Sequence, residues 1–327
     1  MGSSPTLSPG FAAAFLARAD PAGAMTFADF MELALYHPQL GYYRQPRKRV
    51  GYGQGTDFYT ASTSGAVFGE LVASACVSLL GGEAQANEHV FVEIGAEPGG
   101  GVLAGVAHPF VSTRTVRVGE SLEISGRCVV FSNELFDAQP LRRFVRRGAA
   151  WRELGVCLHA DILHEFELGE ISAPWLPATA EEGYVFDAPH AAVELATGLA
   201  AQSWKGLFVA FDYGKSLAEL ATATPAGTVR AYYQHTQSNE LLARPGEQDL
   251  TGHVCWDWLT EALNGAGFNE TAVESQESFF IRHAGPFLAR AMAAEASQLS
   301  QRKLSLLQLL HPSHLGQKFQ VLHGLRR

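Results

Sequence analysis

The segment Val90–Leu103, VFVEIGAEPGGGVL, decides how the fold is interpreted. Its first half is a short apolar run typical of a buried parallel strand, and its second half is rich in glycine. Ligands of open α/β sheets bind at the carboxyl ends of the strands, where glycine lets the backbone approach a cofactor closely. We therefore expect a strand that ends near Gly95, then a helix, with a nucleoside cofactor at the turn between them.

The glycine spacing narrows the class of cofactor. The dinucleotide pattern G-x-G-x-x-G is absent, and no P-loop lysine follows. The methyltransferase pattern E-x-G-x-G-x-G fits at Glu93, Gly95 and Gly99, but Glu97 replaces the middle glycine. A methyltransferase cofactor is S-adenosylmethionine. The Glu97 side chain would crowd it and place a negative charge beside the carboxylate of its methionine part. An ordinary strand-to-helix turn explains this motif equally well when it is taken alone.

Three further apolar segments predict strands of the same sheet: RTVRVG from Arg114, RCVVFSNE from Arg127 and GLFVAFDYG from Gly206. Short apolar strands with helices between them favour a parallel sheet covered on both faces. We expect an α/β fold in which residues 1–88 form a helical N-terminal segment with a long loop. Residues 89–327 would form a Rossmann-like domain, with an insertion of antiparallel strands at about 141–189. Two smaller expectations are a strand at ESFFIR, 277–282, and one long helix over 286–310.

Polar side chains follow several of these strands. Glu120 comes after the second strand, where an acid would accept the two ribose hydroxyls of a nucleoside cofactor. Asn133, Glu134 and Asp137 follow the third strand in FSNELFDAQP, and Asp212 ends the fourth. A pair of carboxylates there could hold a guanidinium through bidentate hydrogen bonds. Each residue could instead serve as a turn cap or a solvated loop acid.

Composition limits the classes of partner. The formal net charge is -9, which disfavours a nucleic-acid partner. The basic runs Arg44–Arg49 and Arg142–Arg147 are expected to be solvated edges rather than binding sites. The four cysteines form no C-x-x-C pair, which favours a reducing compartment, and we expect a cytoplasmic protein. No apolar run is long enough for a transmembrane helix, and the histidines lack a metal-binding pattern, so no metal is expected.

The chain resembles the MidA family of S-adenosylmethionine-dependent methyltransferases, whose mitochondrial members are protein arginine methyltransferases that assist assembly of respiratory complex I. The resemblance is carried in order by these segments: FMELALYHPQLGYY, TDFYTASTSGAVFGEL, VEIGAEPGG, SNELFDAQP, FVAFDYG, PGEQDLTGHVCWDWL and HPSHLGQKFQVL. It implies a class I methyltransferase fold with an added substrate lobe and S-adenosyl-L-methionine as cofactor. It matches Glu93, Gly95, Gly99 and Asn133 to the cofactor site, with Asp57, Phe58, Tyr59 and Thr60 in a segment lying over the cofactor. It also matches Glu134 and Asp137 to the strand-end motif, and Asp249, Thr251 and His253 to a later one.

One departure from that family concerns length. Between Glu120 and Asn133 there is room for a short turn and one strand, whereas a parallel crossover needs a dozen or more residues. We therefore expect one edge strand and its helix to be missing, which would remove a wall of the adenine site and leave Glu120 on a new edge. The remaining sheet would still fold.

Two functions remain open on these residues. In the first, the protein methylates a protein side chain, with arginine favoured; Glu134 and Asp137 orient the guanidinium, and His253 or Asp212 assists. In the second, the fold is a catalytically inactive binding module or assembly factor, as Glu97 and the missing strand suggest. The expected partner is a protein, with no nucleic acid and no membrane span, and homodimerisation is left open.

Overall fold

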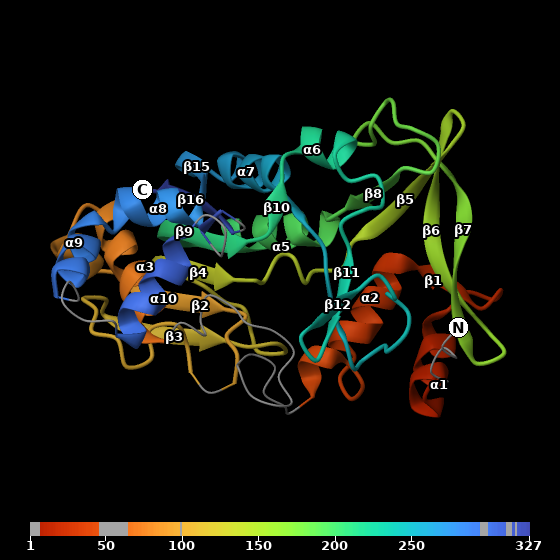
Figure 1. The fold of residues 1–327 in the computed structure, drawn as a ribbon, viewed down its shortest axis with the longest axis horizontal. Helices are drawn as coiled ribbons and strands as arrows, with labels where there is room; N and C mark the ends of the chain where they lie inside the picture. The colour runs from red at the N-terminus through yellow and green to blue at the C-terminus, as the bar shows by residue number, and fades with distance from the viewer. Residues whose placement is uncertain (1–6, 46–64, 99, 295–299, 312–315, 318) are drawn as a thin grey trace.

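The computed structural model describes residues 7–45, 65–98, 100–294, 300–311, 316–317 and 319–327. Two parts are visible in Figure 1: a sheet layered with helices, and a lobe of long antiparallel strands beside it. The expected loop residues Asp57, Phe58, Tyr59 and Thr60, together with Gly99, lie outside the described residues.

The main sheet has six strands in the order β15-β16-β9-β4-β2-β3. Their bounds are β2 Val90–Ile94, β3 Ser112–Val116, β4 Gly126–Asn133, β9 Trp204–Asp212, β15 Asn269–Ser275 and β16 Gln320–Arg326. β3, β2, β4 and β9 pair in parallel, while β16 runs antiparallel to both β9 and β15. The four parallel strands are those predicted from the apolar segments, so the predicted α/β fold class is confirmed.

Helices cover both faces of this sheet. Alternate residues of β9 enter two separate cores, Phe211 on one face and Phe208 on the other. The first face carries α3 Ala66–Leu79, α8 Gln276–His283, α9 Gly285–Ala294 and α10 Gln301–Leu310. The second carries α5 His190–Ala200 and α7 Trp256–Gly265. Burial on both faces explains why these strands are apolar along their whole length.

The second lobe combines the insertion with both earlier and later segments. Its larger sheet contains β1 Ala24–Thr26, β5 Arg142–Arg147, β6 Ala150–His159, β7 Ile162–Ile171 and β8 Val185–Ala188. The smaller sheet contains β11 Arg230–Tyr233, β12 Thr236–Ser238 and β13 Asp249–Thr251. α1 Pro9–Arg18, α2 Phe27–Tyr36 and the 3-10 turn η1 Tyr42–Arg44 complete it. Phe27, Phe30 and Leu250 share one core, so α2 belongs to this lobe.

Short elements connect the two parts. They are β10 Gly214–Lys215, α6 Leu217–Thr222 and β14 Val254–Cys255, whereas the short helix α4 Glu83–Ala86 lies between α3 and β2 within the main part. β10 continues from the end of β9 and pairs in parallel with β14.

The expected loss of an edge strand agrees with the topology. In the described part of the chain β3 is the outermost strand on its side of the sheet, and residues 117–125 contain neither helix nor strand. Arg114 of β3 donates to the carbonyls of Ser121 and Glu123, so the short connection folds against the edge strand.

Two predictions from the last third of the chain are wrong. ESFFIR is not a strand: it lies within α8, which begins after the cap Ser275, whose hydroxyl accepts the Ser278 N–H. The helix expected over 286–310 is divided into α9 and α10. Buried Phe279 and Phe280 point from α8 into the core, so a short apolar run suited a helix as well as a strand.

Basic residues of β5 form ion pairs with acids on neighbouring strands of the second lobe. Arg142 makes two hydrogen bonds with Glu153, at 2.7 and 2.6 Å. Arg143 is buried and pairs with Asp187 at 2.9 Å, which differs from the solvated edge that was expected. The run therefore ties β5 to its neighbouring strands. Among the described residues, no helix is long and apolar enough to cross a bilayer.

A pair of helical glycines tests the packing of α3. A Cβ on Gly69 would collide with the Val102 carbonyl oxygen, whereas one on Gly198 of α5 would meet nothing within 4 Å. Gly69→Ala should lower the free energy of unfolding by about 1–3 kcal/mol through overpacking. Gly198→Ala should raise it by about 0.5–1 kcal/mol through helix propensity. Urea denaturation of both variants measures this, and equal effects would contradict the close contact between α3 and the loop after β2.

Candidate functional site

The turn after β2 requires a glycine at position 95. Gly95 has a φ of +81°, and a Cβ there would lie 3.0 Å from Leu135 Cδ1. Its N–H donates to the Val116 carbonyl at 2.9 Å, which joins the ends of β2 and β3. The backbone conformation and the close approach both exclude larger residues. Gly95 therefore brings the ends of three strands together.

The helix expected after this turn is not formed. Residues 102–105 make only a turn, and Gly100 and Gly105 have φ values of +133° and +73°, which are incompatible with a right-handed helix. The expectation failed because glycine, which was read as permitting close approach to a cofactor, also ends regular structure. The described residues of this loop consequently offer no helix N-terminus to an anionic group.

Glu93 organises the loop instead. Its carboxylate accepts the Val102 N–H at 2.6 Å and occupies the space that a Cβ on Gly101 would need. Burial raises the pKa of Glu93 to about 7, and the hydrogen bond from Val102 lowers it in part. In this structure the predicted cofactor residue thus supports the loop backbone from inside.

Glu120 follows β3 as predicted, but its carboxylate closes its own turn. It is exposed, and it accepts the Arg117 N–H at 2.8 Å. Arg44 of η1 lies over the same turn and donates to the Val118 carbonyl at 2.8 Å. A ribose hydroxyl would have to compete with these contacts.

Asp212 shapes the turn after β4. It is fully buried at the end of β9. Its two oxygens accept backbone N–H groups from Leu135, Phe136, Asp137 and Tyr213, at 2.8 to 3.2 Å. Burial raises its pKa to about 7, while these hydrogen bonds act in the opposite direction. Asp212 is therefore a positioning residue for the segment that carries Glu134 and Asp137.

Four acids define a feature that we call the carboxylate cluster: Glu134, Asp137, Asp212 and Asp249. Burial raises the pKa of Asp137 well above its usual range, and the charges of Asp212, Glu134 and Asp249 raise it further. Burial likewise raises the pKa of Glu134, assisted by Asp212, Asp249 and Glu97. In the described part of the chain, no arginine or lysine lies within ion-pair distance of Glu134, Asp137 or Asp212. The cluster thus concentrates negative charge at one edge of the sheet.

Three polar residues lie at or just after the end of β4, and two of them have a buried oxygen without a hydrogen-bond partner among the described residues. The Asn133 amide donates to Glu134 Oε1 at 3.0 Å, and Asn133 Oδ1 is buried without a hydrogen-bond partner among the described residues. Glu134 has a φ of 54°, a left-handed conformation that costs a non-glycine residue on the order of 1 kcal/mol or more. Asp137 Oδ1 is also buried and unpartnered in the described chain. These oxygens are available to donors from a ligand.

Tyrosines of the second lobe contact this edge, and the sequence did not reveal them. The Tyr36 hydroxyl donates to the Ala138 carbonyl at 3.0 Å, and Tyr43 donates to Asp249 Oδ1 at 2.9 Å. The two rings stack with centroids 5.5 Å apart. Burial, followed by the charge of Asp249, raises the pKa of both tyrosines. The only signal in the sequence was the aromatic cluster YHPQLGYY, and no predicted strand indicated where in the fold it would lie.

His253 lies between β13 and β14. Its N–H donates to Thr228 Oγ1 at 3.1 Å, and its Nδ1 is buried without a hydrogen-bond partner in the described chain. Burial lowers its pKa to about 4, with Lys215 and Arg230 acting in the same direction. No hydrogen bond among the described residues joins it to Glu134 or Asp137. Its catalytic role therefore stays a prediction.

Comparison with known proteins shows similarity to methyltransferases. Residues 114–273 match the model of a family of S-adenosyl-L-methionine-dependent methyltransferases. A zebrafish (Danio rerio) relative, "Protein arginine methyltransferase NDUFAF7, mitochondrial", is 23% identical over 306 aligned positions. The match covers 72% of this chain and 68% of the relative.

Two solved structures from Burkholderia thailandensis have the same fold. One, a superfamily member described as a methyl transferase, is bound to S-adenosyl-homocysteine; it superposes with a TM-score of 0.83 at 23% identity, covering 99% of this chain and 95% of that one. The other, an uncharacterized native protein of the same superfamily, gives a TM-score of 0.79 at the same identity and coverage.

The fold is that of a class I methyltransferase domain with an added lobe. Over residues 114–273 the chain is similar to the family of S-adenosyl-L-methionine-dependent methyltransferases to which the MidA type belongs. This similarity supports the predicted family and its cofactor, S-adenosyl-L-methionine.

The raised pKa of Glu93 gives a test of the loop. Because the native pKa of about 7 exceeds the ordinary value of 4.5, the native state binds this proton more tightly than the unfolded state does. The associated stability is present below about pH 4.5 and is lost as the pH rises through 7. Glu93→Gln keeps an acceptor for Val102 and cannot ionise.

Relative to the wild type, Glu93→Gln should therefore gain on the order of 1–3 kcal/mol of unfolding free energy between pH 5 and pH 8. Chemical denaturation at both pH values measures the difference. A difference between the two proteins that does not change with pH would show that Glu93 is not buried in the loop.

Proposed function

We propose that this protein transfers a methyl group from S-adenosyl-L-methionine to a guanidinium nitrogen of an arginine in a partner protein. The observation that carries the proposal is the carboxylate cluster, whose buried acids raise one another's pKa values. A bound cation would stabilise their ionised forms. A guanidinium presents five N–H donors in a planar fork, which suits two carboxylates better than a lysine ammonium does.

Some residues of the predicted cofactor site suit S-adenosyl-L-methionine, and others do not. Gly95 permits a close approach, and Asn133 Oδ1 offers a buried acceptor; these residues would hold the cofactor at the end of β2 and β4. Glu120 is engaged with its own turn, and Glu97 adds a negative charge that acts on Glu134. When bound, the cofactor supplies an electrophilic methyl group on its sulfonium sulfur.

The residues of the chain would then align the acceptor and remove a proton. Asp137 and Glu134 would accept hydrogen bonds from the guanidinium and hold the reacting nitrogen in line with the methyl group. The new N–C bond forms as the C–S bond breaks, and one N–H proton must leave because the product keeps a single positive charge. Asp137 can take this proton, since burial and its acidic neighbours raise its pKa.

A second function is favoured by the altered cofactor side. Three features weaken a cofactor site. Glu97 replaces the middle glycine, a turn stands where a helix was expected, and the Glu120 carboxylate already accepts the Arg117 N–H. If they abolish binding, the fold would serve as a protein-binding module or assembly factor whose carboxylate cluster engages a basic partner. Cofactor affinity separates the two functions.

Calorimetric titration with S-adenosylmethionine and S-adenosylhomocysteine is the first test. The enzyme requires micromolar binding. Glu97→Gly and Glu97→Gln should both bind about three- to tenfold more tightly if charge is the obstacle, which corresponds to about 1 kcal/mol. A gain in Glu97→Gly alone would point to bulk instead. Lack of binding up to millimolar concentration in wild type would reject the free-standing enzyme.

Asp137→Asn tests the acceptor site. The side chain has an unpartnered buried oxygen, so the variant should fold at least as stably as the wild type. It should bind N-acetylarginine amide at least about tenfold more weakly, because one charged acceptor is lost. The exposed acid Asp161 provides the control Asp161→Asn, with no expected change. Citrulline amide, the uncharged analogue, should not bind to any of these proteins.

The same proteins should be supplied with labelled cofactor and an arginine-containing model peptide. Label on the arginine that disappears in Asp137→Asn, with cofactor affinity retained, would support the proposal. Label on lysine, or guanidinium binding that is equal in Asp137→Asn and wild type, would contradict it.

A further inference from the structure

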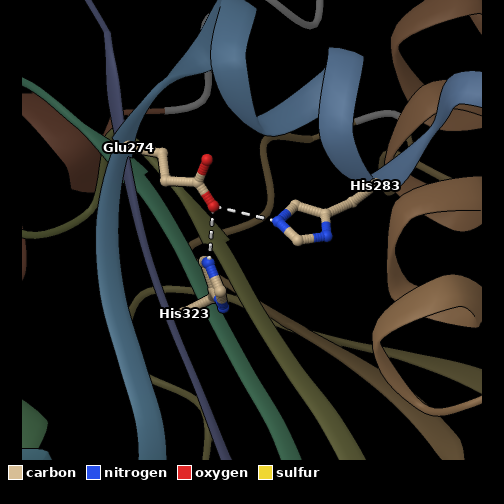
Figure 2. A group of neighbouring side chains, drawn as sticks. All are labelled: Glu274, His283 and His323. Carbon is tan, nitrogen blue, oxygen red and sulfur yellow. Dashed lines mark hydrogen bonds and ion pairs between the residues drawn. The ribbon is translucent and has the colours of Figure 1, made fainter.

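A second group of polar side chains lies on the face of the main sheet that carries α3, α8, α9 and α10. Glu274 of β15, His323 of β16 and His283 of α8 converge as shown in Figure 2. Glu274 Oε1 lies 2.9 Å from His283 Nε2 and 3.1 Å from His323 Nε2. The candidate ligand atoms of the three residues lie within 4.8 Å of one another. None of the three belongs to the carboxylate cluster.

The topology places these residues together. Glu274 pairs with Val321 across β15 and β16, and Ala272 pairs with His323, so Glu274 and His323 are diagonal neighbours on one face. α8 begins immediately after β15 and packs back over this face, which brings its last residue, His283, above them. Three secondary-structure elements thus position three side chains.

We propose that Glu274, His283 and His323 form a binding site for a divalent transition-metal ion, with Zn²⁺ preferred. Two histidines and one glutamate are a ligand set that zinc uses when a fourth position is left to water. With Zn–N and Zn–O bonds of about 2.0–2.2 Å, tetrahedral ligand atoms lie about 3.3 Å apart. The observed O···N separations of 2.9 and 3.1 Å need to widen by only a few tenths of an ångström.

The three candidate ligands are largely shielded from solvent. The side chains of Glu274 and His323 are each 8% exposed, and that of His283 is 20% exposed. The Phe279 ring packs against both imidazoles, with centroids 5.1 and 5.6 Å away, and shields them from water. Arg282 is the nearby cation, 3.1 Å from Glu274 Oε2, but its side chain is 69% exposed and can turn into solvent when a metal binds. A bound metal would fasten α8 to the edge pair β15 and β16.

The alternative is a purely hydrogen-bonded triad, in which Glu274 links two histidines without any metal. The experiment uses the full chain without a histidine tag, stripped with a chelator and titrated with Zn²⁺ by calorimetry and with Co²⁺ by absorption spectroscopy. We expect one ion per chain with micromolar or tighter affinity and a Tm that rises by a few degrees with excess Zn²⁺. The Co²⁺ spectrum should lack a thiolate charge-transfer band.

His323→Gln and His283→Gln each keep a donor to Glu274 but remove a metal ligand. Each should weaken Zn²⁺ binding at least about a hundredfold and abolish the Tm rise. His283 lies at the end of α8, so its variant should fold even if His323→Gln does not. His89→Gln is the matched control, because His89 is buried and hydrogen bonded elsewhere, to the Gln85 carbonyl.

Three outcomes would overturn the proposal. They are no Zn²⁺ binding at millimolar concentration, binding that persists unchanged in both ligand variants, or a thiolate band that assigns the metal to a cysteine site. The first would leave the hydrogen-bonded triad as the correct description. Cofactor titration and arginine binding do not depend on these residues, so failure here is separable from failure of the proposed methyltransferase activity.

Discussion

The geometry of the candidate site depends on one buried carboxylate. Asp212 ends β9 and accepts four backbone N–H groups, three of which come from the turn that follows β4. Backbone N–H groups buried in that turn need acceptors, and neighbouring strands cannot supply them once the sheet has ended. A single side chain on one strand therefore fixes the conformation of residues on the next. The left-handed Glu134 is tolerated because its own N–H is also held, by the Phe211 carbonyl at 2.9 Å.

This arrangement places several acidic side chains close together at one edge of the sheet. Asp212 must be an acceptor for the turn, and the turn then aims Asp137 and Glu134 toward the same region. Burial raises the pKa values of all three acids, and repulsion by the neighbouring acids raises those of Glu134 and Asp137 further. A protein interior disfavours such a group of acids unless protons or a cation compensate it. A site of this kind gains most from a partner that is itself positively charged.

The sequence predicted the strands and several site residues because both leave local signals. Apolar runs on β2, β4 and β9 reported burial on two faces, and acids directly after them reported the edge of the sheet. The sequence could not show that Asp212 holds the backbone while Asp137 Oδ1 is left without a partner among the described residues, because that difference depends on contacts across 75 residues. Tyr36 and Tyr43 were missed for the same reason: their partners, Ala138 and Asp249, are distant along the chain.

The wrong predictions share one physical cause, which is that short segments do not determine their own conformation. Phe279 and Phe280 suit a strand or a helix, and only the Ser275 cap and the packing over β16 decide for α8. Similarly, the glycines after β2 were expected to open a helix, but Gly100 and Gly105 adopt positive φ values. In place of the expected helix, the Glu93 carboxylate holds part of the loop by accepting the Val102 N–H. The described part of the loop provides no helix dipole to attract the carboxylate of a cofactor, which leaves backbone and strand-end groups to contact it.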